Sequence, residues 1–198
     1  MADRLSALDA TFLEIEQMDE GATMHIGGVM VFDPPPAGRA APSLAELCED
    51  MSARLVSLPR YSQRLSQERT GGLAWPQWEP DGRYHIHNHV GRATLPAPGG
   101  DAELTAWSAD FFSHRLDRTR PLWEMVLVDG LEQGRWALAT KTHHCLVDGV
   151  GSVSVGGTTC WAPAAGWIGG SIGAGVIVEG VGGTIGAGAG VAAAVSCA

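Results

Sequence analysis

The residues best suited to chemistry lie together at 143–149, where the sequence reads His-His-Cys-Leu-Val-Asp-Gly. Adjacent residues at the end of a strand point to opposite faces. We therefore expect either His143 or His144 to face a cavity, and the other to point into the domain. Histidine is the side chain best matched to accept a proton near neutral pH. The motif predicts a general base beside a supporting histidine; the alternative is a surface turn with two ordinary histidines.

Three neighbours complete this motif. Asp148 follows His144 by four residues, close enough across a tight turn to fix an imidazole or hold the loop. Gly149 permits a turn or a close approach of substrate that a Cβ would obstruct. Cys145 could serve as a thiol nucleophile, but its side chain should diverge from that of His144, so we expect a small buried core residue.

A second group of histidines occupies alternate positions, at His85, His87 and His89. On a strand these side chains share one face, and a His-x-His pair can bind zinc. Three ligands in line on a straight strand fit a tetrahedral site poorly. We therefore expect a strand face here, and no metal site.

The elements around the motif predict an α/β fold. Strands expected over 125–128 and 136–142 are joined by a turn from Asp129-Gly130 to Gly134, a hairpin that leads directly into His143. A further strand is expected over 24–32, with short strands and turns over 71–90. Helices are expected over 5–13, 44–58 and 101–116; Asp3 is the candidate cap of the first, and Ser43 with Glu46 forms a capping box for the second.

Composition excludes several classes of protein. The chain has 198 residues, of which 45% are hydrophobic, so a folded domain is expected. Its 22 acidic and 13 basic residues give a net charge of −9, and Lys141 is the only lysine, which argues against nucleic-acid binding. The four cysteines form no Cys-x-x-Cys pair, and the amino terminus does not resemble a secretory signal, so we expect a cytoplasmic protein.

The composition changes near residue 155. Residues 156–198 are rich in glycine and alanine, and their only charged residue is Glu179. We predict two regions, a folded domain over 1–155 and a low-complexity tail over 156–198 with little fixed structure. Two alternatives stay open for the tail: a membrane helix over 181–198, which contains glycines at GxxxG spacing, and a hairpin or helix that docks on the folded domain.

The motif HHxxxDG resembles the active-site motif of the CoA-dependent acyltransferases, which include chloramphenicol acetyltransferase-like enzymes and condensation domains. More closely, the chain is similar to the bacterial wax ester synthase/diacylglycerol acyltransferase family. Besides 143–149, the resemblance rests on Leu-Ser-Ala-Leu-Asp-Ala-Thr-Phe-Leu at 5–13 and on the segment 116–124, which contains Pro121-Leu122-Trp123. It covers residues 4–155.

The resemblance implies transfer of a long-chain acyl group from acyl-CoA to the hydroxyl of diacylglycerol or a fatty alcohol, in triacylglycerol or wax ester synthesis. His144 would be the general base and His143 a buried, supporting residue, while Asp148 and Gly149 would organise the loop. Residues 121–123 would shape the site. Acyl-CoA would be a substrate, with no cofactor and no metal.

The resemblance also implies a two-layer α/β sandwich of the chloramphenicol acetyltransferase type. Family members are much longer and contain two similar halves, whereas this chain departs from the pattern soon after Val155, so we expect the amino-terminal half only. Peripheral association with the inner membrane face or with lipid droplets is also expected. One rival is an inactive fragment that binds lipid or a homologue. Another is a condensation-type domain acting on carrier-protein thioesters, which the motifs at 5–13 and 121–123 argue against.

Overall fold

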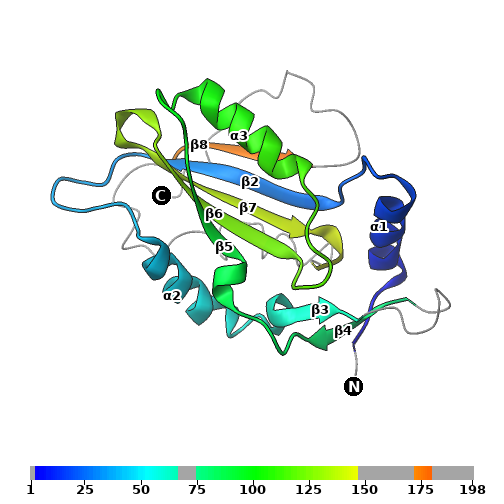
Figure 1. The fold of residues 1–198 in the computed structure, drawn as a ribbon. Helices are drawn as coiled ribbons and strands as arrows, with labels where there is room; N and C mark the ends of the chain where they lie inside the picture. The colour runs from blue at the N-terminus through cyan, green and yellow to red at the C-terminus, as the bar shows by residue number, and fades with distance from the viewer. Residues whose placement is uncertain (1–2, 67–74, 147–171, 180–198) are drawn as a thin grey trace.

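The computed structural model describes residues 3–66 and 75–146, and the backbone of 172–179. These residues form a five-stranded sheet, a three-stranded sheet and three α-helices (Figure 1). The large sheet has the strand order β5-β6-β7-β2-β8, and only the β5–β6 pair is parallel. Its strands are β5 (Val90–Thr94), β6 (Trp123–Asp129), β7 (Trp136–His143), β2 (His25–Phe32) and β8 (Ile172–Glu179).

The central strand β7 delivers the histidine motif. All eight of its residues are buried, because β6 and β2 flank it and side chains cover both faces of the sheet. The β6–β7 connection contains a short 3-10 turn, η3 (Glu132–Gly134). Gly130 and Gly134 have φ angles of 78° and 73°, which glycine adopts without strain. The predicted hairpin into His143 is confirmed.

The first helix, α1 (Ala7–Met18), begins at a different residue from the one expected. Ser6 is its N-cap: the Ser6 hydroxyl accepts the Asp9 N–H at 3.1 Å, and the Asp9 carboxylate accepts the Ser6 N–H at 3.3 Å. This reciprocal pair satisfies two free donors at the helix start. Asp3 as the cap was wrong, because Asp3–Arg4 forms strand β1 and pairs with β4 (Gln77–Pro80), whose other neighbour is β3 (Gln63–Leu65).

The other two helices were predicted correctly but end earlier than expected. The capping box of Ser43 and Glu46 starts α2 (Leu44–Leu55), and Pro59 then opens the 3-10 turn η1 (Pro59–Ser62), since proline disfavours helical backbone in the residue before it. Helix α3 (Asp101–Ser113) ends where His114 becomes extended.

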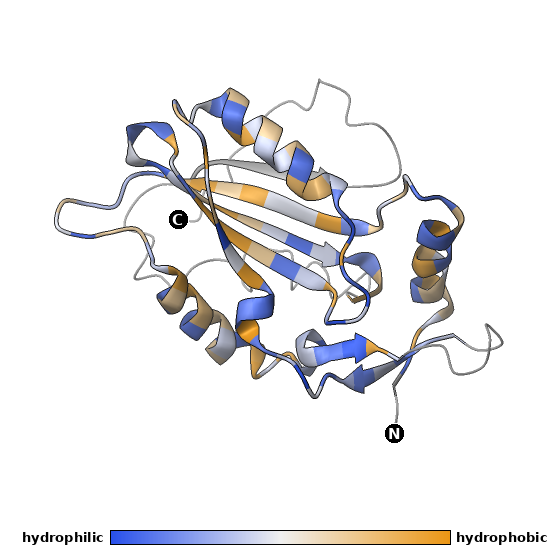
Figure 2. Ribbon diagram, in the orientation of Figure 1, coloured by the Kyte–Doolittle hydropathy of each residue, from blue (hydrophilic) through white to orange (hydrophobic). Residues whose placement is uncertain are grey.

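Two cores cover the two faces of the large sheet, which confirms the α/β class. Helix α3 lies along one face (Figure 1), where Phe112 packs with small and branched side chains of the strands, among them Val29, Val128 and Ala139. The larger core on the other face includes side chains of α2 such as Leu47 and Met51. Figure 2 shows hydrophobic residues alternating with polar ones along the strands between these helices.

One segment of the glycine-rich tail belongs to the sheet. Strand β8 pairs antiparallel with β2, so residues 172–179 of the tail have regular backbone structure. Residues 156–171 and 180–198 lie outside the described part, and with them the predicted span at 181–198; the boundary at 155 stays a prediction. Among the described residues, no helix is long and apolar enough to cross a membrane.

Candidate active site

The two motif histidines differ in burial where β7 ends. His143, the last residue of β7, is 1% exposed, whereas His144 is half-buried at the start of the 3-10 turn η4 (His144–Leu146). The His143 N–H donates to Leu122 O at 3.0 Å, and the His144 N–H donates to Met24 O at 2.9 Å. The backbone at this point is therefore fixed from two sides. The predicted burial of His143 is confirmed, while the opposite orientation of the two rings and the roles of both residues remain predictions.

The surroundings of His143 define its tautomer. Its Nδ1 accepts the Cys145 N–H at 3.1 Å, so a ring proton must reside on Nε2. Nε2 lies 3.4 Å from Oε1 of Glu16, a residue of α1 that is 2% exposed. His143 is thus held inside the domain between a backbone amide and a buried carboxylate.

Glu16 is a functional candidate that the sequence did not reveal. Its Oε1 accepts the Met24 N–H at 2.6 Å, and its Oε2 accepts from Nη2 of Arg118 at 2.8 Å. Burial by itself raises the pKa of the Glu16 carboxyl, but the contacts with His143, Arg118 and the Met24 amide outweigh burial and lower this pKa to about 2. Glu16 is therefore ionised at neutral pH. One feature of the sequence could have indicated Glu16: it follows Leu13 by three residues, so an acidic side chain lies on the apolar side of the helix.

The ring of His144 rests on an aromatic neighbour. Its imidazole stacks on the Phe12 ring with the centroids 4.9 Å apart and the planes 26° apart. Asp148 and Gly149, the other predicted members of the motif, lie outside the described residues. The described part of the motif is thus the histidine pair and the turn through Leu146.

Residues Pro121, Leu122 and Trp123 are buried beside this strand end. Trp123 Nε1 donates to Tyr61 O at 2.8 Å, and the indole stacks on His89 with the ring centroids 4.6 Å apart. Leu122 contributes the carbonyl that accepts the His143 N–H. The triplet is therefore linked to the histidine motif through the backbone, and its site-shaping role stays a prediction.

The expected strand face of His85, His87 and His89 was wrong. The segment contains a 3-10 turn, η2 (Ile86–Asn88), because His89 is drawn into the core against Trp123 while His85 and His87 are exposed. His87 Nδ1 lies 3.3 Å from the Sγ of Cys48, whereas His89 stacks on Trp123. Within the ranges that the structure describes, no three potential metal ligands converge.

The expected burial of Cys145 is confirmed. It is 2% exposed, and burial raises the pKa of its thiol, which favours the uncharged form. An uncharged thiol is a poor nucleophile. The geometry therefore favours His144 over Cys145 as the reactive group of the motif.

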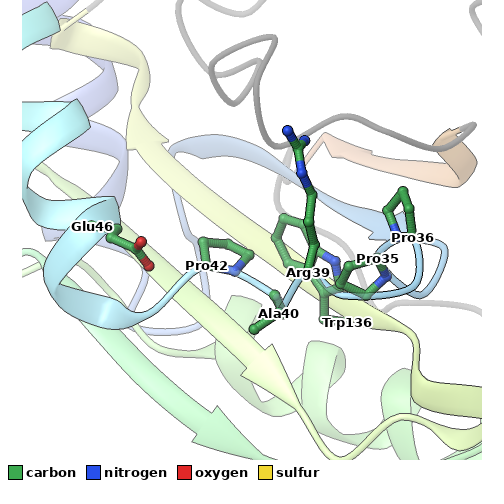
Figure 3. A pocket seen from close by; sticks show the side chains of 8 residues that line it. Pro35, Pro36, Arg39, Ala40, Pro42, Glu46 and Trp136 are labelled. Carbon is green, nitrogen blue, oxygen red and sulfur yellow. The ribbon is translucent and has the colours of Figure 1, made fainter.

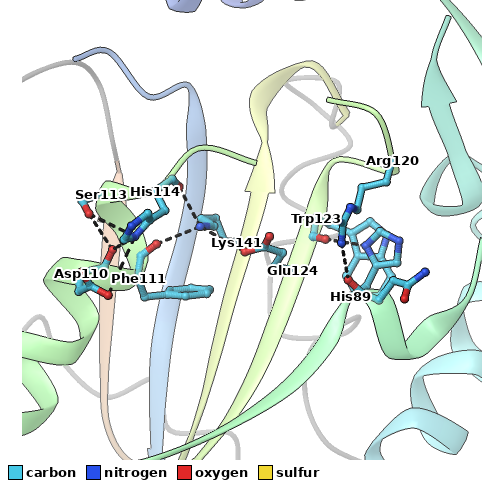
Figure 4. A network of polar contacts seen from close by, with 10 residues as sticks. His89, Asp110, Phe111, Ser113, His114, Arg120, Trp123, Glu124 and Lys141 are labelled. Carbon is cyan, nitrogen blue, oxygen red and sulfur yellow. Dashed lines mark hydrogen bonds and ion pairs between the residues drawn. The ribbon is translucent and has the colours of Figure 1, made fainter. Parts of the chain in front are cut away.

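Two further buried groups lie near His143 on the α3 side of the sheet. Lys141 Nζ donates to the carbonyls of Phe111 and His114, each at 2.9 Å, and lies 3.3 Å from Glu124 Oε2 (Figure 4). The lysine thereby joins the end of α3 to the sheet. His25 pairs directly opposite His143 across β2 and β7; burial and the positive charge of Lys141 lower its pKa to about 4, so it is neutral at pH 7.

A hollow at the other end of β7 is separate from this site. It is lined by Pro35, Pro36, Arg39, Ala40, Ala41, Pro42, Glu46 and Trp136 (Figure 3). Trp136 is the first residue of β7 and His143 the last. At about 3.3 Å per residue, roughly 23 Å of strand separates the two. The hollow is therefore not part of the candidate active site.

The fold of this chain is similar to that of two kinds of solved structure. The chain superimposes on the starter condensation domain of the rhizomide synthetase RzmA with a TM-score of 0.59 and 15% identity, covering 79% of this chain and 37% of that chain. It also superimposes on a wax ester synthase/diacylglycerol acyltransferase from Marinobacter aquaeolei VT8 with a TM-score of 0.63 and 33% identity, covering 78% and 36%. The fold is thus the one that condensation domains share with these acyltransferases.

The sequence narrows this class to one family. Residues 5–161 match the wax ester synthase/diacylglycerol acyltransferase catalytic domain, and the chain belongs to that family. It is 42% identical over 156 residues to a probable diacyglycerol O-acyltransferase, tgs3, of Mycobacterium tuberculosis, covering 79% of this chain and 55% of the relative. The chain therefore spans about half the length of this curated relative and about a third of the solved one.

The low pKa of Glu16 leads to a prediction about acid stability. Its pKa is about 2 in the folded chain, against an ordinary 4.5. The carboxylate should stabilise the fold above pH 4.5, and this contribution of up to about 3 kcal/mol should disappear as the pH falls towards 2. Urea unfolding from pH 7 to pH 3 should therefore show the stability gap between wild type and Glu16→Gln closing with acid. Glu14→Gln, at an exposed position of α1, is the control, and a constant gap for Glu16→Gln would contradict the prediction.

Proposed function

We propose that this chain carries the general-base half of an O-acyltransferase site, which moves a long-chain acyl group from acyl-CoA to the hydroxyl of diacylglycerol or a fatty alcohol. The observation that carries the proposal is the difference in burial between the two histidines. His144 is half-buried on a fixed turn, and His143 is locked behind it by Glu16 and the Cys145 amide. The membership of the family supports the same reaction class.

In this proposal His144 removes the proton from the acceptor hydroxyl while the hydroxyl oxygen attacks the thioester carbonyl carbon. The new C–O bond forms, the C–S bond breaks, and the CoA thiolate takes the proton from His144 as it leaves. The reaction balances without a covalent enzyme intermediate. Acyl-CoA is a substrate, and no cofactor or metal is required.

The surroundings of His144 suit this role. The stacked Phe12 ring limits the orientations of the imidazole, and the hydrogen bond from the His144 amide to Met24 fixes its backbone. A base held in one orientation contributes more to the rate than a mobile one, since its freedom does not have to be lost in the transition state. We further propose that the chain acts in the cytoplasm and meets its lipid acceptor at a membrane or lipid-droplet surface.

The proposal is tested by incubating the chain with palmitoyl-CoA and either dioleoylglycerol or hexadecanol. Free CoA is followed with a thiol reagent, and the ester is identified by mass spectrometry. The assay uses the 198-residue chain alone and the chain extended with the carboxyl-terminal part of the Marinobacter relative, with that complete relative as the positive control. Ester formation that requires His144 supports the proposal. Folded protein that forms no ester in either version contradicts it.

A further inference from the structure

Helix α1 presents two side chains to the histidine pair. Phe12 and Glu16 are four residues apart, so they lie on the same face of the helix one turn apart. Phe12 stacks on His144, and Glu16 faces Nε2 of His143. We infer that Phe12 and Glu16 are positioning residues of the active site: Phe12 fixes the plane of the His144 imidazole, and Glu16 holds the ring of His143 and the backbone of His144 in place. The inference rests on the proposed function, since it takes His144 as the base.

Glu16 reaches His144 through the backbone of a single residue, Met24. Its Oε1 accepts the Met24 N–H at 2.6 Å, and the Met24 carbonyl accepts the His144 N–H at 2.9 Å. The same carboxylate lies beside His143 Nε2. A displacement of Glu16 would therefore disturb both histidines, one through its ring and the other through its backbone.

Arg118 fixes the carboxylate to the rest of the domain. Its Nη2 donates to Glu16 Oε2 at 2.8 Å and to the Leu13 carbonyl at 3.0 Å, so one guanidinium contacts both the side chain and the backbone of α1. Arg118 stands three residues before Pro121 in the chain. Helix α1 is thereby attached to the segment that leads into β6, and Phe12 has a defined position relative to β7.

The Phe12 ring has an electrostatic effect as well as a steric one. When His144 accepts the hydroxyl proton, its imidazole becomes a cation, and a cation is attracted to the face of an aromatic ring. Together with the lost orientation, removal of the ring by Phe12→Leu should lower kcat about three- to tenfold. KM should change little, because Phe12 acts through His144. Phe12→Tyr keeps the ring face and should retain most of the rate.

The test combines kinetics with nuclear magnetic resonance on the whole chain. Phe12→Leu should shift the His144 ring protons, because the ring current of Phe12 is lost. Leu8→Ala, at a position of the same helix that is 61% exposed, is the matched control and should leave these signals in place. Glu16→Gln should shift the ring signals of His143, because the adjacent carboxylate charge is lost, and lower kcat about tenfold. Glu14→Gln should change neither.

The outcomes separate this inference from the proposed function. If His144→Ala keeps full activity, the proposed function fails whatever Phe12 does. If His144→Ala loses activity while Phe12→Leu and Glu16→Gln keep both the wild-type kcat and the wild-type histidine signals, only the positioning inference fails. If Glu16→Gln does not fold, the Phe12→Leu variant alone tests the inference, because Phe12 is only half-buried and its replacement should leave the fold intact. If no ester forms, the proposed function fails and the positioning inference fails with it; in an active protein, shifted histidine signals together with the lowered kcat support the inference.

Discussion

Replacement of His144 by alanine is expected to slow acyl transfer about 10²- to 10⁴-fold, the usual contribution of a positioned general base. KM for acyl-CoA should change little, because the variant lacks the proton acceptor and keeps the surrounding structure. The half-buried side chain lies on a turn whose backbone is held through its own amide, so the fold should survive. The measurement is kcat and KM in the ester-formation assay, with the circular dichroism spectrum recorded for each variant.

Two neighbouring substitutions serve as controls for His144→Ala. His143→Ala should lower thermal stability as well as activity, because it leaves a cavity and removes the acceptor of the Cys145 N–H. Cys145→Ser should remain largely active, since a buried uncharged thiol does not take part in the proposed reaction. Full activity of His144→Ala would remove the base from the mechanism. Loss of activity in Cys145→Ser without loss of stability would point to the thiol instead.

The largest effect on stability is expected at Trp123. Its side chain is fully buried, stacks on His89 and donates to the Tyr61 carbonyl. Trp123→Ala should cost about 3–5 kcal/mol of unfolding free energy, because it leaves a large cavity and an unpaired carbonyl. Urea denaturation measures this loss. Trp123→Phe keeps most of the volume and should cost less, which gives a second value if the alanine variant does not fold.

The matched control is another tryptophan with a different environment. Trp75 is 51% exposed, and its Nε1 donates to Glu14 at the surface. Trp75→Ala should change the unfolding free energy by only about 0.5 kcal/mol. Equal losses at the two positions would show that Trp123 does not occupy the closed core site seen here.

The sequence predicted those features that depend on residues close together in the chain. The capping box of Ser43 and Glu46 starts α2, and the glycines of the turn after Asp129 set the hairpin that leads to His143. Both signals act over a few residues, so they can be read without knowing the fold. The burial of His143 likewise follows from its place at the end of the buried strand β7.

The features that were missed depend on distant contacts. Glu16 gains its place in the site from Arg118, 102 residues away, and no local pattern indicates that pair. The alternating histidines suggested a strand, but His89 packs on Trp123, 34 residues later, and the backbone turns to reach it. In both cases tertiary packing overrides the local pattern.

The position of Lys141 determines how amine-directed reagents will act on this protein. It is the only lysine of the chain, and in the fold its amine is enclosed by two carbonyls at the end of α3 and by Glu124. Reagents that acylate or cross-link lysine amines therefore have no open lysine target in the folded chain, and unfolding creates one. Cross-linking through lysines will yield no distance information on the native protein, whereas acylation of Lys141 will report the detachment of α3 from the sheet.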